Sequence, residues 1–295
     1  CMYEYSDFRE VKPGYFQDHF GVVWNRSGAD KDIGIVSNQV LSQPSLKGFV
    51  LPPIDERAIR RLIEDGLRSN PDKFNLYCIG FSLFERAWTL CGMEDLLVYM
   101  VREPKFVHEL MDLITEYNLR ILDIAMEYEV DGIHFGDDWG QQQGMIMGST
   151  HWRTFILPGI KRLYGAAKSK GKVVSQHSCG DIQEVFGDLI DAGLDVYQTF
   201  QTEIYDVERI KKEYGNHLTF WGGISTQRLL PSGTPQQVYD ETCRMIELMS
   251  ENGGYILAPT HAVPGDVPPE NIMAMLNAAN PALTSIYPQY FEFMN

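Results

Sequence analysis

One stretch of the chain holds a complete strand, helix and strand: KVVSQHSCGDIQEVFGDLIDAGLDVYQTF, residues 172–200. Its two ends, 172–177 and 194–200, carry the β-branched and aromatic residues that are typical of strands. Between them, the apolar residues of 182–192 recur at helical spacing, and Gly193 follows as a C-terminal cap. Parallel strands need a long crossover connection, usually a helix, so two strands joined by one helix predict a parallel pair.

The same alternation of short strands and helical runs continues on both sides of this stretch. Four more segments have strand character: FNLYCIGF (74–81), DGIHFGD (131–137), HLTFWGGI (217–224) and GYILAPT (254–260). Longer runs with helical spacing lie between the strands, at 93–128, 150–170, 234–251 and 269–279. Repeated βα units predict an α/β protein, and the lack of a glycine-rich nucleotide loop favours a (β/α)8 TIM barrel over an open doubly wound sheet.

The first 53 residues lack this alternation. We interpret 1–53 as an irregular N-terminal segment, with a strand or hairpin near 15–24, that covers the mouth of a barrel formed by 54–295. The length of 295 residues fits a single domain of this class. Because the chain opens on Cys1, we also expect an N-terminal part to be missing.

Composition limits the partners and the compartment. A net charge of −15 and the lack of a dense Lys/Arg cluster argue against nucleic acid as a partner. Five scattered cysteines do not form a disulfide framework, so we expect reduced thiols. No apolar run reaches the roughly 18 residues of a membrane span, and no signal peptide is visible, so we expect a cytoplasmic protein with no membrane partner.

A histidine and a cysteine stand two residues apart at the end of the strand 172–177. In a barrel the carboxyl ends of the strands converge on one face, where catalytic groups gather. His177 and Cys179 can present an imidazole and a thiolate to one zinc ion, and His261, after the last strand, would complete an open three-ligand site. The other interpretation of this pair is a small buried thiol beside a hydrogen-bonded histidine.

Other strand ends supply further candidates. Asp137 and Asp138 follow a strand, and neighbouring side chains of an extended segment point to opposite sides, so at most one faces the mouth. That carboxylate would be catalytic, by accepting a proton or orienting a ligand, and the other would cap a helix or pair structurally. His261 is a catalytic candidate as well as a ligand. For substrate binding the strand ends offer Glu85, Trp88, Trp139, Gln141, Gln201 and Trp221, with the tryptophans as walls of an apolar pocket.

Five segments in order resemble the uroporphyrinogen decarboxylase superfamily: GFSLFERAWTL, GIHFGDDWG, HSCGDI, WGGISTQ and ILAPTHAVPGDVPPENI. The resemblance implies a (β/α)8 barrel with one of two activities. In the zinc-dependent methyltransferase branch an H-x-C motif binds the metal, and His177 with Cys179 match it, although the usual third ligand is a cysteine where this chain has His261. In the decarboxylase branch the last-strand histidine matches His261, but the N-terminal arginine-rich signature is absent here.

Three hypotheses follow for the function. The first is a zinc-dependent methyltransferase that moves a methyl group from a small methylated substrate, a methyl ether or amine, to the cobalt of a corrinoid carried by a partner protein. The second is a decarboxylase in tetrapyrrole metabolism that handles protons with His261 and an aspartate and needs no metal. The third is a non-catalytic binding barrel. A homodimer is compatible with any of them.

Overall fold

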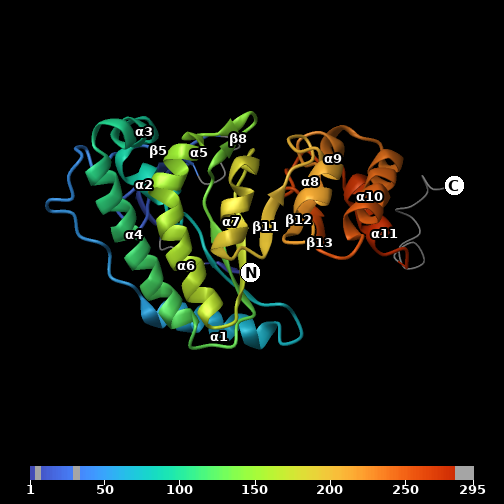
Figure 1. The fold of residues 1–295 in the computed structure, drawn as a ribbon, viewed down its shortest axis with the longest axis horizontal. Helices are drawn as coiled ribbons and strands as arrows, with labels where there is room; N and C mark the ends of the chain where they lie inside the picture. Colours follow the sequence, from blue (N-terminus) through green and yellow to red (C-terminus); the bar gives the residue numbers. More distant parts are fainter. Residues whose placement is uncertain (4–7, 29–33, 283–295) are drawn as a thin grey trace. The chain divides into compact units, whose positions relative to one another are not determined.

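The structure is a computed structural model that describes residues 1–3, 8–28 and 34–282 (Figure 1). Its residues form two compact units, and the single-domain organisation expected from the sequence stays a prediction. The first unit comprises Cys1–Trp139, Ile146–Ser175 and Asp191–Gly193, and the second comprises Gly140–Met145, Gln176–Ile190 and Leu194–Asn295. Among the described residues, no helix is both long enough and apolar enough to span a bilayer.

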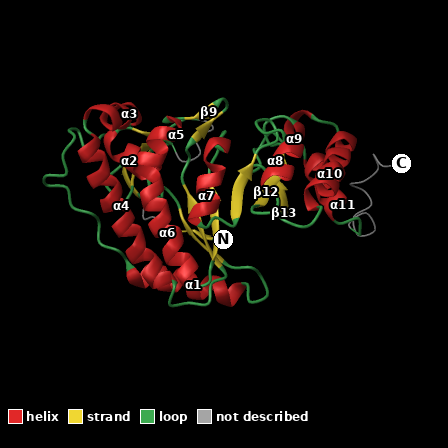
Figure 2. Ribbon diagram, in the orientation of Figure 1, coloured by secondary structure: helices red, strands yellow, loops and turns green. Residues whose placement is uncertain are grey.

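The first unit is built on parallel strands that follow the chain order. The strand order is β1-β6-β7-β10, with Cys78 opposite His134 in the register of β6 and β7. Helix α4 packs against both α6 and α1 (Figure 2). The bounds are β1 (Met2–Tyr3), α1 (Glu56–Ser69), β6 (Leu76–Ile79), α2 (Phe84–Cys91), α3 (Met93–Arg102), α4 (Pro104–Ala125), β7 (Gly132–Gly136), α5 (Gly148–His151), a π-helical turn (Trp152–Ile156), α6 (Leu157–Ser169) and β10 (Val173–His177).

The second unit contains the last two residues of β10 and has the strand order β10-β11-β12-β13. Tyr197 of β11 lies opposite Phe220 of β12, and Gly222 of β12 lies opposite Leu257 of β13. Helices α10 and α11, orange to red in Figure 1, pack against each other. The bounds are β8 (Gly140–Gln141), β9 (Gly144–Met145), α7 (Phe186–Ala192), β11 (Val196–Phe200), α8 (Val207–Tyr214), β12 (Thr219–Ile224), α9 (Leu229–Ser232), α10 (Pro235–Ser250), β13 (Tyr255–Pro259) and α11 (Pro269–Ala279).

The predicted α/β architecture is confirmed. All six strands expected from the sequence are present, parallel and in chain order, and helices alternate with them. With β1 the described residues supply seven strands of one sheet, and a complete (β/α)8 barrel has eight. The predicted helical run at 93–128 is two helices, because Pro104 cannot donate the backbone hydrogen bond of a continuous helix.

The N-terminal segment is more regular than the sequence indicated. It contains an antiparallel sheet of order β2-β3-β4-β5, formed by β2 (Arg9–Lys12), β3 (Tyr15–Gln17), β4 (Val23–Asn25) and β5 (Ile35–Val36). The two preceding residues of β1 pair with β6 and therefore belong to the parallel sheet. That this segment covers the barrel mouth stays a prediction.

A buried ion pair ties the antiparallel sheet to helix α2. The Asp18 carboxylate lies 3.0 Å from the Arg86 guanidinium, and their side chains are only 3% and 9% exposed. Asp18 also accepts hydrogen bonds from the backbone N–H groups of Phe20 and Val22, and the guanidinium lies over the Phe20 ring. Each charge thus has the partners that burial demands.

The side chain of Asp137, the residue directly after β7, caps the N-terminus of helix α2, which is distant in the sequence. Leu83 precedes that helix and has no side-chain acceptor. The Asp137 carboxylate accepts the N–H of Phe84 at 2.9 Å and that of Glu85 at 2.7 Å, and it accepts the Trp139 indole N–H at 2.6 Å. The carboxylate is fully buried, and burial raises the pKa of Asp137 to about 6 against the lowering effect of these hydrogen bonds.

Replacing Asp18 tests the buried ion pair. Asp18→Asn leaves the Arg86 charge buried without its counter-ion, so we expect the free energy of unfolding to fall by about 3–5 kcal/mol. The control is Asp65→Asn, which breaks the exposed pair with Arg61, where side-chain exposures are 53% and 84%; such pairs contribute at most about 1 kcal/mol. Urea-induced unfolding measures both changes, and equal losses in the two variants would contradict the prediction.

The pKa of Asp137 predicts a pH-dependent stability. Folding raises this pKa from 3.8 to about 6, so the folded protein binds the proton of Asp137 more tightly than the unfolded chain does. The contribution of this proton to the free energy of unfolding is fully present below about pH 4 and is lost as the pH rises through about 6. The difference in unfolding free energy between the wild type and Asp137→Asn should therefore shrink from pH 4 to pH 6. Urea unfolding at several pH values measures it, and a difference that grows over this range would mean that the hydrogen bonds outweigh burial.

Candidate metal centre

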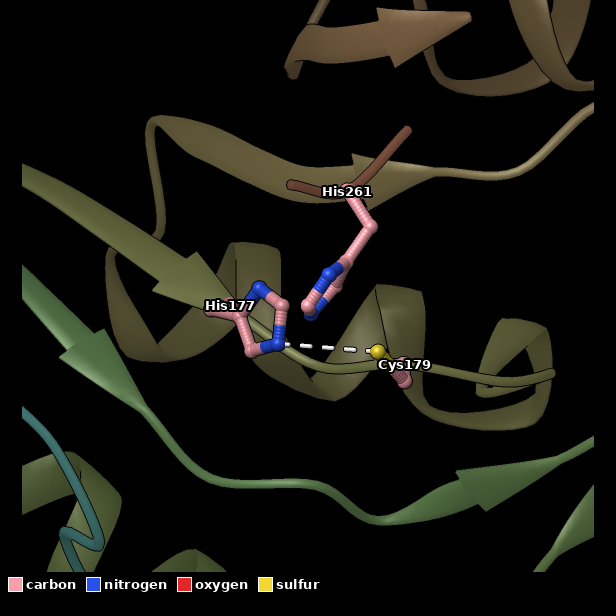
Figure 3. A group of neighbouring side chains, drawn as sticks. All are labelled: His177, Cys179 and His261. Atoms are coloured by element: carbon pink, nitrogen blue, oxygen red, sulfur yellow. Dashed lines mark hydrogen bonds between the residues drawn. The ribbon is translucent and has the colours of Figure 1, made fainter. Parts of the chain in front are cut away.

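Three side chains with ligand atoms meet in the second unit. His177 is the last residue of β10, Cys179 lies two residues later, and His261 follows β13 (Figure 3). Their ligand atoms all lie within 4.8 Å of one another. The Cys179 Sγ is 3.6 Å from the His177 Nε2, and the two imidazole centroids are 5.9 Å apart. The structure thus brings together the three residues that the sequence predicted as metal ligands.

The spacing of one donor pair, the Cys179 sulfur and the His177 Nε2, fits zinc. Tetrahedral bonds of about 2.0–2.1 Å to nitrogen and 2.3 Å to sulfur place the two donor atoms about 3.5 Å apart, and the observed distance is 3.6 Å. Two imidazoles and one thiol are also ligands that zinc accepts in proteins. His177 and Cys179 are half-buried and His261 is exposed, so the group is accessible from solvent.

A glutamine fixes the orientation of the first histidine. The His177 Nδ1 is hydrogen-bonded to the Gln198 side-chain oxygen. An amide oxygen only accepts, so Nδ1 carries the hydrogen and the lone pair is left on Nε2, the atom that faces Cys179. Gln198 lies in β11, within the predicted strand 194–200, but nothing in the sequence marked this residue as the partner of His177.

The turn after β10 requires glycine. Gly180 has a φ of +79°, and a Cβ atom there would lie 2.3 Å from the backbone nitrogen of Gln141. The Gln141 carbonyl in turn accepts the N–H of Asp181 at 2.8 Å. Gln141 therefore supports this turn through its backbone, while its exposed side chain keeps the predicted role in substrate binding as a prediction.

Gln201 also contacts the same turn. Its side-chain oxygen accepts the N–H of Gly180 at 2.8 Å, and the residue is 5% exposed. Trp221, the other substrate-binding candidate of this unit, lies half-buried on β12. The structure thus gives Gln201 a structural contact that the sequence did not predict, and the substrate-binding roles of both residues stay predictions.

The remaining candidates lie in the first unit. Trp139 is fully buried, donates to Asp137 and packs edge-on against Trp152 with centroids 5.2 Å apart. Trp88 lines a hollow of about 700 Å³ together with residues 34–39, Gly92 and Met93. Glu85 is half-buried in the first turn of α2, where a carboxylate favours the helix dipole, and Asp138 is half-buried after β7. Asp137 takes the capping role, and a catalytic role of either aspartate stays a prediction.

Comparison with known proteins gives the family. Residues 68–281 match the family model described as uroporphyrinogen decarboxylase (URO-D). Uroporphyrinogen decarboxylase from Chlorobaculum tepidum is 24% identical over 253 residues, which cover 80% of this chain and 69% of that protein. The methylated-thiol–coenzyme M methyltransferase of Methanosarcina mazei is 26% identical over 197 residues, which cover 66% of this chain and 50% of that protein.

Two further matches carry methyltransferase names. The methylcobamide:CoM methyltransferase MtaA of Methanosarcina barkeri is 23% identical over 64% of this chain and 53% of its own length. The solved structure of a methyltransferase from Methanosarcina mazei superposes with a TM-score of 0.72 at 18% identity, over 90% of this chain and 77% of that one, and so shares the fold. The chain thus spans about half the length of the two methyltransferases matched by sequence. By the family model, which covers most of its length, this chain belongs to the uroporphyrinogen decarboxylase (URO-D) family.

Proposed function

We propose that this protein is a zinc-dependent methyltransferase that passes a methyl group from a small methylated substrate to a corrinoid carried by a partner protein. The observation that carries the proposal is the convergence of His177, Cys179 and His261 within 4.8 Å. The names of two relatives, a methylated-thiol–coenzyme M methyltransferase and a methylcobamide:CoM methyltransferase, support it. They add methylated thiols to the methyl ethers and amines that the sequence suggested as donors.

The residues of the centre suit this chemistry. A zinc ion bound here would act as a Lewis acid and stabilise the negative charge that develops on the heteroatom when its bond to the methyl carbon breaks. Gln198 holds the His177 imidazole in the tautomer that ligates through Nε2. Cys179 supplies the sulfur, and the exposed His261 stands on the solvent side, where a small substrate can reach the group.

A decarboxylase is the second candidate. The relative from Chlorobaculum tepidum bears that name, and the resemblance to that branch implies that His261 corresponds to its last-strand histidine. Two features disfavour it. A net charge of −15 suits a polycarboxylate substrate poorly, and both oxygens of the Asp137 carboxylate already accept hydrogen bonds from N–H groups of α2.

Removing the thiol tests the metal site. We expect Cys179→Ala to weaken zinc binding by more than about 100-fold. Loss of a residue that hydrogen-bonds to a metal ligand weakens binding by about 10–100-fold, and loss of the ligand itself has a larger effect. The matched control is Cys243→Ala, which removes another half-buried thiol of the same unit and should leave the zinc affinity unchanged. Competition with a chromophoric chelator measures the affinity, and elemental analysis gives the zinc content. Unchanged zinc binding in Cys179→Ala would remove the basis of the proposal.

A transfer assay tests the reaction. Wild-type protein loaded with zinc should methylate free cob(I)alamin with at least one donor from a panel of methyl ethers, methylamines and methylated thiols. Cys179→Ala should be slower by about 100-fold or more, the usual effect of losing a group that stabilises developing charge. The absorption spectrum of the corrinoid follows the transfer. Metal-independent release of carbon dioxide from uroporphyrinogen, with no methyl transfer, would support the decarboxylase instead.

A further inference from the structure

Two tyrosine hydroxyls hold the backbone of the turn that carries the candidate ligands. We call residues 177–182 the ligand loop, and we propose that Tyr205 and Tyr197 are positioning residues that fix this loop in its metal-binding shape before the metal arrives. The inference rests on the proposed zinc site and deepens it, since it names residues that set the affinity without touching the ion.

The hydrogen bonds of the two hydroxyls end on the ligand loop. Tyr205 donates to the Gly180 carbonyl at 2.8 Å and accepts the N–H of Ile182 at 3.1 Å. Tyr197 donates to the Ser178 carbonyl at 3.0 Å. The two hydroxyl oxygens lie 3.0 Å apart, within hydrogen-bond distance of each other. The backbone on both sides of Cys179 is therefore held from one side by two phenols.

Other groups accept further N–H groups of the loop, and one hydroxyl within it donates to its backbone. Gln201 accepts from Gly180 at 2.8 Å, the Gln198 carbonyl accepts from Ser178 at 2.7 Å, and the Gln141 carbonyl accepts from Asp181 at 2.8 Å. The Cys179 carbonyl accepts from the Ser178 hydroxyl at 3.1 Å. None of these contacts uses the sulfur of Cys179 or the Nε2 of His177, two atoms that lie 3.6 Å from each other, so the backbone of the loop is braced by groups other than the candidate ligand atoms.

The tyrosine rings are fixed by packing. Tyr197 is fully buried and Tyr205 is 5% exposed. The Phe186 ring lies 4.9 Å from the Tyr197 ring and 5.7 Å from the Tyr205 ring, and Phe200 stacks on Tyr205 at 5.6 Å with an interplanar angle of 7°. Burial raises the pKa of Tyr205, so its hydroxyl keeps the proton that it donates. The rings cannot swing away, and the hydroxyls hold the loop at fixed points.

A braced loop raises metal affinity because its ordering is complete before binding. A flexible loop must lose conformational freedom when its ligands gather around an ion, and that loss reduces the affinity. Removing a brace should therefore weaken binding even when both ligands remain. The expected size is the 10–100-fold loss that follows when groups orienting the ligands are removed.

The test compares three tyrosine-to-phenylalanine variants, each of which removes one hydroxyl and keeps the ring. Tyr205→Phe should bind zinc about 10–100-fold more weakly than the wild type, and Tyr197→Phe should also bind more weakly. The matched control is Tyr255→Phe: the Tyr255 hydroxyl also donates to a backbone carbonyl of the same unit, that of Gly222 at 3.0 Å, which is not part of the ligand loop. Its zinc affinity should stay within about twofold of the wild type, a change well below the 10–100-fold loss expected for Tyr205→Phe.

Two readouts separate positioning from a general loss of stability. Zinc affinity comes from chelator competition, and the spectrum of the cobalt(II)-substituted protein reports the coordination geometry, so Tyr205→Phe should alter the thiolate-to-cobalt band while Tyr255→Phe should not. Thermal unfolding of the metal-free proteins gives the stability of each variant. Equal zinc affinities in Tyr205→Phe and the wild type, or equal losses in Tyr205→Phe and Tyr255→Phe, would overturn the inference. A wild type that binds no zinc would instead remove the proposed function itself.

Discussion

Two stretches of backbone touch where Gly140 faces Gly180, and the candidate metal centre depends on that contact. A Cβ atom on Gly180 would lie 2.1 Å from the carbonyl carbon of Gly140, and one on Gly140 would lie 2.6 Å from that of Gly180. Both distances are far shorter than carbon atoms tolerate. Only glycine at both positions allows the chain to turn directly after Cys179, which brings its thiol to within 3.6 Å of the His177 imidazole.

The parallel part of the fold could be predicted because its signals are local. Each of the six expected strands is a short apolar run followed by a helical pattern, and each appears in the structure. The antiparallel sheet of β2 to β5 could not be predicted from the sequence. Its strands have only two to four residues, and the alternation of apolar and polar residues that marks a strand cannot be recognised over so short a length. The contact that ties this sheet to helix α2 joins Asp18 to Arg86, which are 68 residues apart in the sequence.

The ligand atoms could be predicted, but the groups that hold them could not. His177 and Cys179 stand out by their spacing and His261 by its place after the last strand. Gln198 and Tyr205 have no such signal, because an amide or a phenol acquires its role only through the packing of β11 and the following segment against the ligand loop. The capping role of Asp137 depends in the same way on a distant segment, since helix α2 begins after Leu83 without a cap of its own.

The bracing of the ligand loop has an evolutionary consequence. Most of its hydrogen bonds join backbone groups to residues elsewhere in the unit, so the side chains at 177 and 179 can be exchanged while the loop keeps its course. A duplicated gene could gain or lose a metal-dependent reaction through a few substitutions on an unchanged scaffold. Such interchangeability offers a route by which one ancestral barrel diversified into proteins named for two unrelated chemistries, decarboxylation and methyl transfer.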